Sequence, residues 1–361
     1  MTTKDIFPAS RNTPEKEPFF HNLPQEIINF VSNYLLEQPP IKSFIIPNAF
    51  ASSYGVVMEK WKLIPESFSV YQSRKKDRIY SFFSFLKARI LGRVIHTKAN
   101  CLLVNHCWHD NYYHWMIELL PRLFLWEKKA PLLTLVIHKK KFKYQRETLA
   151  YFNFRDIIEL DDGEILRCPQ VEFSSFPNFS YLGRIQSKGK NYSAIILRLN
   201  HRLLAEMVNK IIQNIPNRIN PAPENKIYIS RKKAPKRKIV NEIDLEALLH
   251  SEGFSTIIME DLNFEQQVQL IQSASILIAC HGAGLANCIF MKPNTVVIDL
   301  VPGNLPEFCF WNLAHARQLH YAHVHCKTVG VEKNPAFNDI EVDMLQIKSL
   351  LSIVKSKPPE T

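Results

Sequence analysis

The sequence lacks any long uninterrupted apolar run. No window approaches the roughly 18 consecutive apolar residues that a membrane-spanning helix needs, and the stretch from Met1 to Asn22 contains no apolar segment typical of a signal peptide. Both absences argue against an integral membrane protein and against export. We therefore expect a cytoplasmic protein.

Cysteine is sparse as well. The seven cysteines include no C-x-x-C pair, so the sequence predicts neither a disulfide framework nor a thiolate zinc site. Histidines gather in "HCWHDNYYH" and "HARQLHYAHVHC", but neither cluster has the regular spacing of a zinc motif such as H-E-x-x-H. We expect reduced, mostly buried thiols, no metal and no bound cofactor.

Acidic residues are the minority charge. The chain has 45 Lys and Arg against 34 Asp and Glu, a formal net charge of +11, which favours an anionic partner such as nucleic acid, anionic lipid or a phosphorylated small molecule. The two densest basic runs are Lys139–Arg146 ("KKKFKYQR") and Arg231–Lys238 ("RKKAPKRK"). A lysine-rich run usually forms only a solvent-exposed surface. The place of each run in the fold therefore indicates whether it binds an anion.

Glycine is rare, with ten residues in 361, yet two of them lie two apart in "ACHGAGLANC". The apolar runs Ser275–Cys280 and Thr295–Val301 on either side predict strands that are buried on both faces. The residues between them are enough for a glycine turn and a short helix. Such a turn lies at the carboxyl end of a parallel strand and offers free backbone N–H groups, which favour an anion.

The chain alternates strand and helix patterns in two series, which predicts an α/β fold with two parallel sheets. Before Asn100 only fragments of strand pattern appear. The first series ends in a long helical segment, about 193–215, and the proline-rich stretch that follows is typical of a linker. We expect an N-terminal domain (1–216), a linker (217–224), a C-terminal domain (225–330) and a helix or tail (331–361) that packs back on the N-terminal domain.

The basic loop at Arg231 and the glycine turn at Gly282 both follow strands of the second series. Carboxyl ends of parallel strands meet at one edge of a sheet, where open α/β sheets bind ligands. We therefore expect all six basic residues of Arg231–Lys238 to lie above the turn. Two arginines and free amides suit a diphosphate better than a single carboxylate. The alternative, a solvated basic loop over an ordinary turn, stays open.

The segment "WHDNYYHWMIELLPRLF" holds the second candidate site. On a helix that begins near Asn111, His114 and Glu118 are four residues apart and share a face. A carboxylate one turn from an imidazole can fix its tautomer and raise its basicity, as a general base requires. The alternative is a structural pair under an aromatic lid of Tyr112, Tyr113 and Trp115. Pro121 should kink or end the helix.

Taken together and in order, these segments resemble glycosyltransferase family 61. The resemblance covers about residues 100–321 and is carried by "NYYHWMIELLPRL", "DDG", "KIYISRKKAPKRKIVNE", "HGAGLANCIFMKPNTVVIDLVP" and "FWNLAHARQLHYA". It implies the GT-B fold, with two facing Rossmann-like domains and an interdomain cleft. It also implies transfer of a sugar, with inversion, from a nucleotide-sugar donor such as a UDP-sugar bound mainly by the C-terminal domain.

The resemblance also implies roles for the candidate residues. Either His114 or Glu118 would be the catalytic base, and which of them it is stays open. The donor diphosphate would be held without a metal, because arginines and backbone amides can stabilise the departing charge. The residues expected at the donor are Arg231, Arg237, His281, Gly282, Ala283, Gly284, Leu285 and Asn287, with Glu307, Trp311 and Asn312 near the nucleotide or sugar.

Eukaryotic members of this family carry an N-terminal signal or anchor, and the composition of Met1–Asn22 leads us to expect none here. We therefore expect a bacterial cytoplasmic enzyme of surface polysaccharide synthesis, acting on a glycan or lipid-linked acceptor. Lys139–Lys143 would contact the anionic inner membrane surface at its periphery.

Two rival functions are disfavoured by particular residues. A nicotinamide-dependent enzyme would need a third glycine where Asn287 stands, and a terminal acidic residue on the next strand, where Asp299 is internal. A nucleic-acid-binding protein usually interleaves aromatic residues with its charges, and Arg231–Lys238 contains none, so no nucleic-acid partner is expected.

Overall fold

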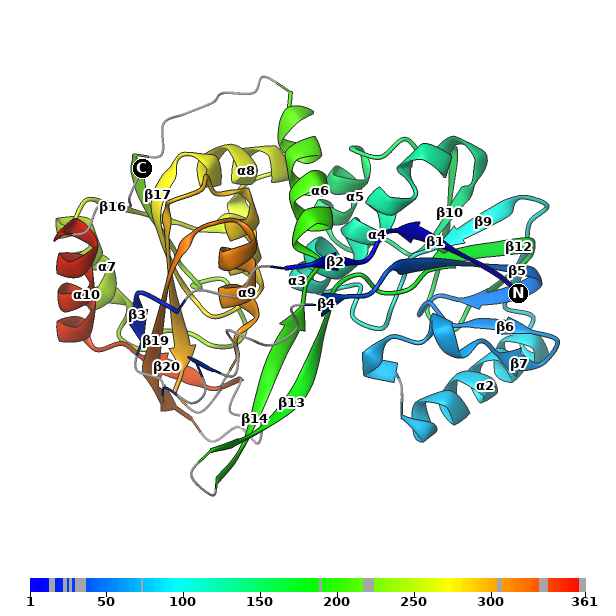
Figure 1. The fold of residues 1–361 in the computed structure, drawn as a ribbon, viewed down its shortest axis with the longest axis horizontal. Coiled ribbons are helices and arrows are strands. Elements are labelled where there is room, and N and C mark those ends of the chain that lie inside the picture. The colour runs from blue at the N-terminus through cyan, green and yellow to red at the C-terminus, as the bar shows by residue number, and fades with distance from the viewer. Residues whose placement is uncertain are drawn as a thin grey trace. The chain divides into compact units, whose positions relative to one another are not determined.

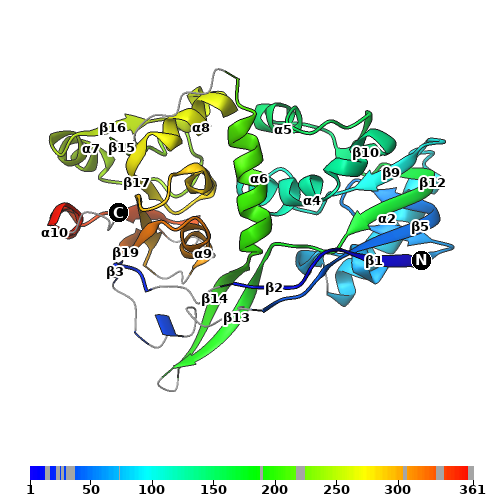
Figure 2. The same cartoon turned by 45° about the horizontal axis from the view of Figure 1, so that its top comes forward.

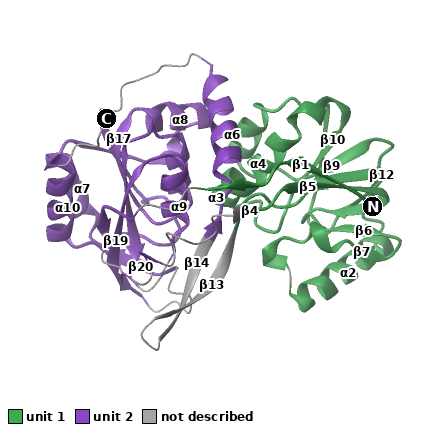
Figure 3. Ribbon diagram, viewed as in Figure 1, with its two compact units in different colours: residues 1–12, 37–181 green, residues 13–36, 182–361 purple. Residues whose placement is uncertain are grey.

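The chain folds into two compact units (Figure 3). Unit 1 comprises residues 1–12 and 37–181, and unit 2 comprises 13–36 and 182–361. The computed structural model describes residues 1–12, 17–21, 25, 28–29, 37–72, 74–187, 190–216, 224–303, 307–330 and 337–356, and omits the side chains of 180–196. The units therefore divide at 181, not at the expected 216, and the expected linker, 217–224, lies outside the described residues apart from Glu224.

Unit 1 is built on one mixed sheet (Figure 1). Its strands, in spatial order, are β11 (Asp156–Leu160), β10 (Thr134–His138), β9 (Asn100–Leu103), β12 (Ile165–Ser174), β5 (Ile41–Ser52), β6 (Val57–Glu59) and β7 (Lys62–Leu63), with β1 (Thr2–Phe7) on β5 and β8 (Val94–His96) on β12. Its helices are η1 (Pro65–Ser67), η2 (Val70–Gln72), α2 (Lys75–Ile90), α3 (Tyr112–His114), η3 (Trp115–Leu119), α4 (Leu120–Leu125), η4 (Glu127–Leu132) and α5 (Lys143–Leu149).

Only part of this sheet is parallel. Strands β8 to β12 run parallel, as the alternating pattern predicts, and their inward side chains form the unit 1 core with those of β5. The expectation of a fully parallel sheet is wrong for β1, β5, β6 and β7, which pair antiparallel. These strands and α2 come from the first 98 residues, where no clear periodicity marks them.

Unit 2 is built on a sheet in which β15 to β19 are all parallel. Its order is β16 (Phe254–Ile257), β15 (Asn225–Ile229), β17 (Ala274–Cys280), β18 (Val296–Pro302), β19 (His320–Val329) and β20 (Asp339–Glu341), with β3 (Phe20–His21) on β19. Its helices are α6 (His201–Gln213), α7 (Glu242–Ser251), η5 (Met259–Asp261), α8 (Phe264–Gln272), η6 (Ala283–Phe290), α9 (Cys309–Ala316) and α10 (Met344–Ser356).

Two separate pairs of strands complete the described strands of the chain. They are the hairpin of β13 (Phe179–Ser187) and β14 (Lys190–Arg198), and the short pair of β2 (Ser10–Arg11) and β4 (Glu37–Gln38).

Several local predictions for unit 2 are confirmed. Strand β18 is buried along its whole length, Asn263 and Gln266 form the expected capping box of α8, and Gly253 ends α7 with φ +83°. The helix expected from residue 193 begins only at His201, because Lys190–Arg198 pairs as β14. Asn241 precedes α7, but its side chain bonds the backbone of Val342 instead of capping the helix.

The C-terminal helix α10 belongs to unit 2. Its residues Ile347, Leu350 and Leu351 are buried in the same core as Leu249 of α7, and the two helices lie side by side (Figure 1, Figure 2). We expected residues 331–361 to pack back on the N-terminal domain. This expectation is wrong for α10, because its apolar face is buried in the unit 2 core.

All seven cysteines are free, and all except Cys107 are buried, as expected. No helix in the described part of the chain combines the length and the apolar character needed to cross a bilayer.

Pro121 distorts the helix that carries the second candidate site. Proline has no N–H to bond the carbonyl four residues earlier, and the backbone widens into the π-helical turn η3 just before it. The side chain of Asn178 donates to the carbonyl of Ile117 at 2.8 Å, which replaces the missing bond. The kink predicted from Pro121 is therefore accommodated by one buried amide.

We predict that Asn178→Ala lowers the free energy of unfolding by about 1–3 kcal/mol, because it leaves a buried carbonyl without a donor. Urea unfolding measures this loss. Asn214→Ala is the matched control, since the Asn214 amide also donates to a helix carbonyl, that of Lys210 at 2.8 Å, but at an exposed position. Equal losses in the two variants would contradict the explanation.

Candidate functional site

The carboxyl ends of three parallel strands bring polar side chains together in unit 1. Strand β9 leads into Asn105 and His106, β10 ends at His138, and β11 is followed by Asp162. Because parallel strands end at one edge, residues far apart in the sequence meet there. The His114 helix starts from the same edge, capped by the side chain of Asn111, which accepts from the N–H of Tyr113.

His114 and Glu118 are brought together as the spacing predicts. The distance from His114 Nδ1 to Glu118 Oε2 is 3.0 Å, and Tyr71 donates to the other carboxylate oxygen at 2.7 Å. Glu118 is fully buried, whereas the His114 side chain is 16 % exposed. The His114 ring is therefore held through Nδ1, and Nε2 has no hydrogen bond to the described residues.

Two further groups surround the Glu118 carboxylate. His106 Nε2 lies 3.3 Å from Glu118 Oε2, and burial holds the pKa of His106 well below its ordinary value, so this imidazole is neutral. Arg122 is buried and donates to the carbonyls of Val104 and Ser174. Burial lowers the pKa of Arg122 to about 9, and nearby Glu118 opposes that shift, so the guanidinium stays charged at neutral pH.

The aromatic cover of His114 differs from the expected lid. Trp115 is buried and donates to Thr148, so it belongs to the core. Trp108, which the sequence analysis missed, stacks on His114 with centroids 6.0 Å apart and is 52 % exposed. A tryptophan one residue from the "HD" pair in "CWHD" was the available signal.

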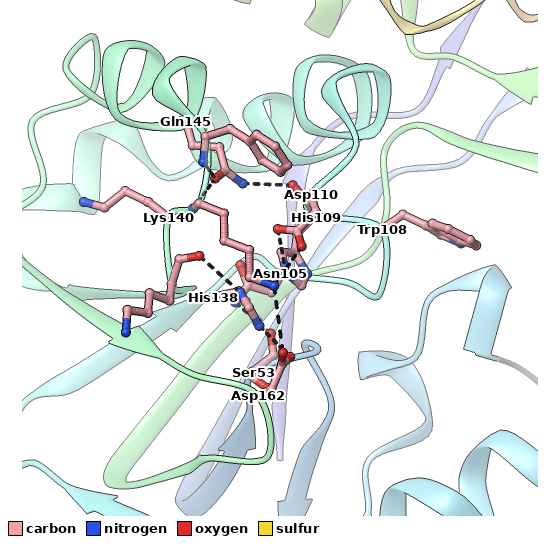
Figure 4. A network of polar contacts seen from close by, with 12 residues as sticks. Ser53, Asn105, Trp108, His109, Asp110, His138, Lys140, Gln145 and Asp162 are labelled. Carbon is pink, nitrogen blue, oxygen red and sulfur yellow. Dashed lines mark hydrogen bonds and ion pairs between the residues drawn. The ribbon is translucent and has the colours of Figure 1, made fainter. Parts of the chain in front are cut away.

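A second network lies beside this one, on the same strand ends (Figure 4). His109 and His138 stack with centroids 3.9 Å apart, and His138 Nε2 lies 3.0 Å from Asp162 Oδ1. Hydrogen bonds from Tyr54 and His138 lower the pKa of Asp162 to about 2. Asp162 belongs to the "DDG" segment, which thus fixes β11 to β10.

The lysines of Lys139–Lys143, which we expected to contact a membrane, form ion pairs with carboxylates of the same unit. Lys139 pairs with Asp161, Lys140 with Glu159, Lys141 with Asp110 and Lys143 with Glu147, at 2.9 to 3.4 Å. Carboxylates therefore balance most of this run, which weakens its attraction for an anionic surface.

In unit 2 the glycine turn follows β17, as predicted, and leads into η6. No described group accepts a hydrogen bond from the backbone N–H groups of Ala283 and Gly284. The guanidinium of Arg231 lies directly over Gly282: a Cβ built there would meet Arg231 Nη1 at 2.3 Å. A side chain at position 282 would therefore force the end of the Arg231 side chain to move away from the turn.

The two arginines of the basic loop are fixed by backbone carbonyls. Arg231 Nε donates to the carbonyl of Arg237 at 3.1 Å, and Arg237 Nη1 donates to that of His281 at 2.8 Å. Arg231 Nη1 has no acceptor among the described residues. Not all six basic residues serve the turn as expected, because Lys232 pairs with Glu246 and Lys233 with Asp261.

His281 is closed in by carboxylates that the sequence analysis did not connect with it. Its Nδ1 lies 2.9 Å from Asp299 Oδ2, and its Nε2 contacts Glu307. Burial alone would lower the pKa of His281, but Asp299 and Glu307 raise it well above its ordinary value. Both ring nitrogens of His281 contact carboxylates, and the residue is buried. The ring therefore supports the glycine turn and has no free nitrogen with which to bind a ligand.

A lone aspartate inside the apolar strand "TVVIDLV" was the signal for this contact. A buried carboxylate needs a partner, and Asp299 pairs in register with Ala279, two residues before His281. Tyr321 also donates to Asp299, at 2.7 Å.

The remaining expected donor-site residues are buried. Asn287 donates to the carbonyl of Gly284 at 3.1 Å, and Leu285 is in the core. Trp311 is buried in α9, and Asn312 donates to the carbonyl of Leu197. These side chains shape the turn and its support, while Ala283 and Gly284 are partly exposed.

Three groups of side chains in the described ranges place possible metal ligands within 4.8 Å of one another: His106, His114 and Glu118; His109, Asp110 and His138; and His281, Glu307 and Cys309. Each group contains a close histidine–carboxylate contact.

The glycosyltransferase 61 family model matches residues 112–298, slightly more than half of the chain. The match contains the His114 helix, the basic loop and the glycine turn. The chain belongs to glycosyltransferase family 61.

Several curated glycosyltransferases are similar in sequence to this chain. A rice beta-1,2-xylosyltransferase is 27 % identical over 262 residues, covering 66 % of this chain and 43 % of the relative. A Xenopus tropicalis protein O-linked-mannose beta-1,4-N-acetylglucosaminyltransferase 2 is 30 % identical over 142 residues, 38 % of this chain and 24 % of the relative. A chicken EGF domain-specific O-linked N-acetylglucosamine transferase is 26 % identical over 188 residues, covering 48 % and 33 %. The match to this chain thus spans less than half the length of each of these relatives.

The His281 contacts predict how this family 61 chain responds to pH. The folded pKa lies above the unfolded value, so the stability that His281 contributes is complete below about pH 6.5 and is lost as pH rises toward the folded pKa, by up to about 1.4 kcal/mol per pH unit. We expect urea unfolding to show this decline in the native chain and not in His281→Gln. The control variant His250→Gln changes an exposed histidine and should show the same loss of stability with rising pH as the native chain. If His281→Gln also shows this loss, His281 is not its source.

Proposed function

We propose that the chain is an inverting glycosyltransferase that uses a nucleotide-sugar, a UDP-sugar in particular, and needs no metal. Unit 2 binds the donor and unit 1 supplies the catalytic base. The two facing domains and the cleft of a GT-B enzyme belong to the same proposal. The observation that carries it is the Arg231 guanidinium lying over Gly282, next to the unbonded amides of Ala283 and Gly284.

A nucleoside diphosphate suits this donor site chemically. The Arg231 Nη1 donor and the first amides of η6 offer several N–H groups to one anion, at the carboxyl end of β17. Arg237 adds a second positive charge held beside the turn. When the bond from the sugar to the diphosphate breaks, these fixed donors stabilise the departing charge, which is the task otherwise given to a divalent ion. His281 positions the turn instead of binding the donor.

His114 is the base in this proposal and Glu118 positions it. With Nδ1 held by Glu118, Nε2 accepts the proton of the acceptor hydroxyl as its oxygen attacks the anomeric carbon. The bond to the diphosphate breaks in the same step, and the diphosphate leaves with the electron pair, so the configuration inverts. Glu118 stabilises the imidazolium that forms. Exposed Trp108 offers a flat apolar face on which a sugar of the acceptor stacks.

The acceptor is a glycan or a lipid-linked glycan of bacterial surface polysaccharide synthesis, and the enzyme works in the cytoplasm at the inner membrane. Support for sugar transfer comes from the family 61 relatives, whose names include xylosyl and N-acetylglucosaminyl transfer. The nicotinamide alternative is further weakened, because Asp299 is buried under His281 and does not face a ribose.

We predict a separation between catalysis and donor binding. His114→Ala and Glu118→Gln should lower the rate of transfer by about 10²–10⁴-fold, the usual contribution of a general base, and leave UDP affinity unchanged. Arg231→Ala should weaken UDP binding about tenfold or more through loss of a charged hydrogen bond. Calorimetric titration with UDP and a transfer assay measure the two effects. Loss of UDP affinity in the His114 variant would overturn these roles.

The donor class is tested by thermal unfolding with UDP, TDP, GDP, NAD and a short DNA duplex, each with manganese or with EDTA. A ligand at about a hundred times its dissociation constant stabilises the fold by roughly 2.7 kcal/mol. We expect UDP to raise the midpoint equally in manganese and in EDTA. Stabilisation by NAD or DNA alone would refute the proposal, and a shift that requires manganese would refute its metal independence.

A further inference from the structure

Helix α2 and the β6–β7 hairpin carry a cluster of exposed apolar side chains in unit 1. On α2, Ile79, Phe83 and Ile90 are 51 %, 60 % and 74 % exposed, and their spacing of four and seven residues places them on one helix face. Tyr80, Leu91 and Trp61 are 73 %, 55 % and 51 % exposed. We call these six residues the α2 patch.

The opposite face of α2 anchors the helix to unit 1. Phe85 and Ala88 are buried in a small core with Val56 and Met58 of the β5–β6 region, and Figure 1 shows α2 beside β6 and β7. The helix is therefore held rigidly by one side and presents its second apolar face outward.

The α2 patch is surrounded by positive charge. Between residues 60 and 93 the acidic residues are Glu66 and Asp77, and the basic residues are Lys60, Lys62, Arg74, Lys75, Lys76, Arg78, Lys87, Arg89 and Arg93. On the helix, Lys76 and Lys87 flank the apolar stripe on one side and Lys75 on the other. In the described part of the chain these three lysines have no ion-pair partner, unlike Lys139–Lys143.

The hairpin tip keeps a bulky aromatic residue in an unfavourable conformation. Lys60 and Trp61 have φ of +45° and +67°, a region in which a two-residue turn normally places glycine or asparagine. Such a backbone is strained for a large side chain and points to a function for it. The guanidinium of Arg89 lies 4.4 Å from the centre of the Trp61 ring, so the tip is joined to α2.

From these features we infer that α2 lies in the plane of an anionic bilayer surface. The apolar stripe enters the boundary between headgroups and acyl chains, Trp61 and Tyr80 lie at the interface, and the flanking lysines bind lipid phosphates. The apolar stripe matches the acyl chains of such a surface, and its basic borders match the lipid phosphates. The lysines of Lys139–Lys143 are already paired with carboxylates and do not offer this match. If the proposed function holds, this contact brings unit 1 to a membrane that carries the acceptor.

Vesicle flotation of the full-length chain tests the inference. Wild type should bind vesicles of phosphatidylcholine with about 30 % phosphatidylglycerol, bind pure phosphatidylcholine weakly, and detach as salt is raised. The triple variant Ile79→Ser, Phe83→Ser, Ile90→Ser should bind at least about tenfold more weakly. The matched control is Leu132→Ser, Ile243→Ser, Leu345→Ser, whose residues are 76 %, 80 % and 76 % exposed elsewhere in the fold, and it should bind like wild type.

Three outcomes would overturn the inference: no binding of wild type to anionic vesicles, equal weakening in the two triple variants, or a wild-type dimer in light scattering that the α2 variant abolishes. The last would mean that the patch binds a second copy of the chain. The assay contains no nucleotide, so its result is independent of the donor proposal, and the UDP thermal shift of the α2 variant should equal that of wild type.

Discussion

A buried carboxylate that must be paired is the constraint on which both candidate sites depend. Glu118 in unit 1 and Asp299 in unit 2 are fully buried, and a charge removed from water is tolerated only with close partners. Each carboxylate therefore collects a histidine and a tyrosine hydroxyl. His281 directly follows β17, and the His114 helix begins after β9, so both histidines lie beyond the carboxyl ends of parallel strands. The position of the two sites follows from the sheets, and their internal order follows from the carboxylates.

The two carboxylates leave their histidines in opposite states. Glu118 occupies one nitrogen of His114, so the other nitrogen is available for proton transfer. Asp299 is joined by Glu307, so His281 is filled on both sides and keeps its proton. The same pair of residue types thus yields a candidate base in one unit and a structural cation in the other. The number of carboxylates around the ring, which the sequence does not show, decides between them.

The sequence predicted the parts of the molecule that rest on local periodicity or short spacing. The buried strands around the glycine turn, the His114–Glu118 pair and the capping box at Asn263 all depend on neighbours within a few residues, and all are present. Features that depend on distant partners were missed. Strand β5 finds its place through β12, some 120 residues later; Asn178 completes a helix that begins near Asn111; and Glu307 reaches His281 across β18. Charge runs misled for the same reason, because the carboxylates that neutralise Lys139–Lys143 lie mainly on other segments.

The course of the chain between the units affects how the protein is made. Residues 1–12 belong to unit 1, 13–36 to unit 2, 37–181 to unit 1 and the remainder to unit 2, and β3, within the second of these segments, pairs with β19 near the other end of the sequence. On the ribosome, unit 1 is complete once residue 181 has emerged, so it can fold early. Strand β3 must wait for its partner, because β19 begins about 300 residues after β3 in the sequence. No single cut separates the two units, and a fragment that starts at residue 182 would leave the β19 edge open to pairing with another chain.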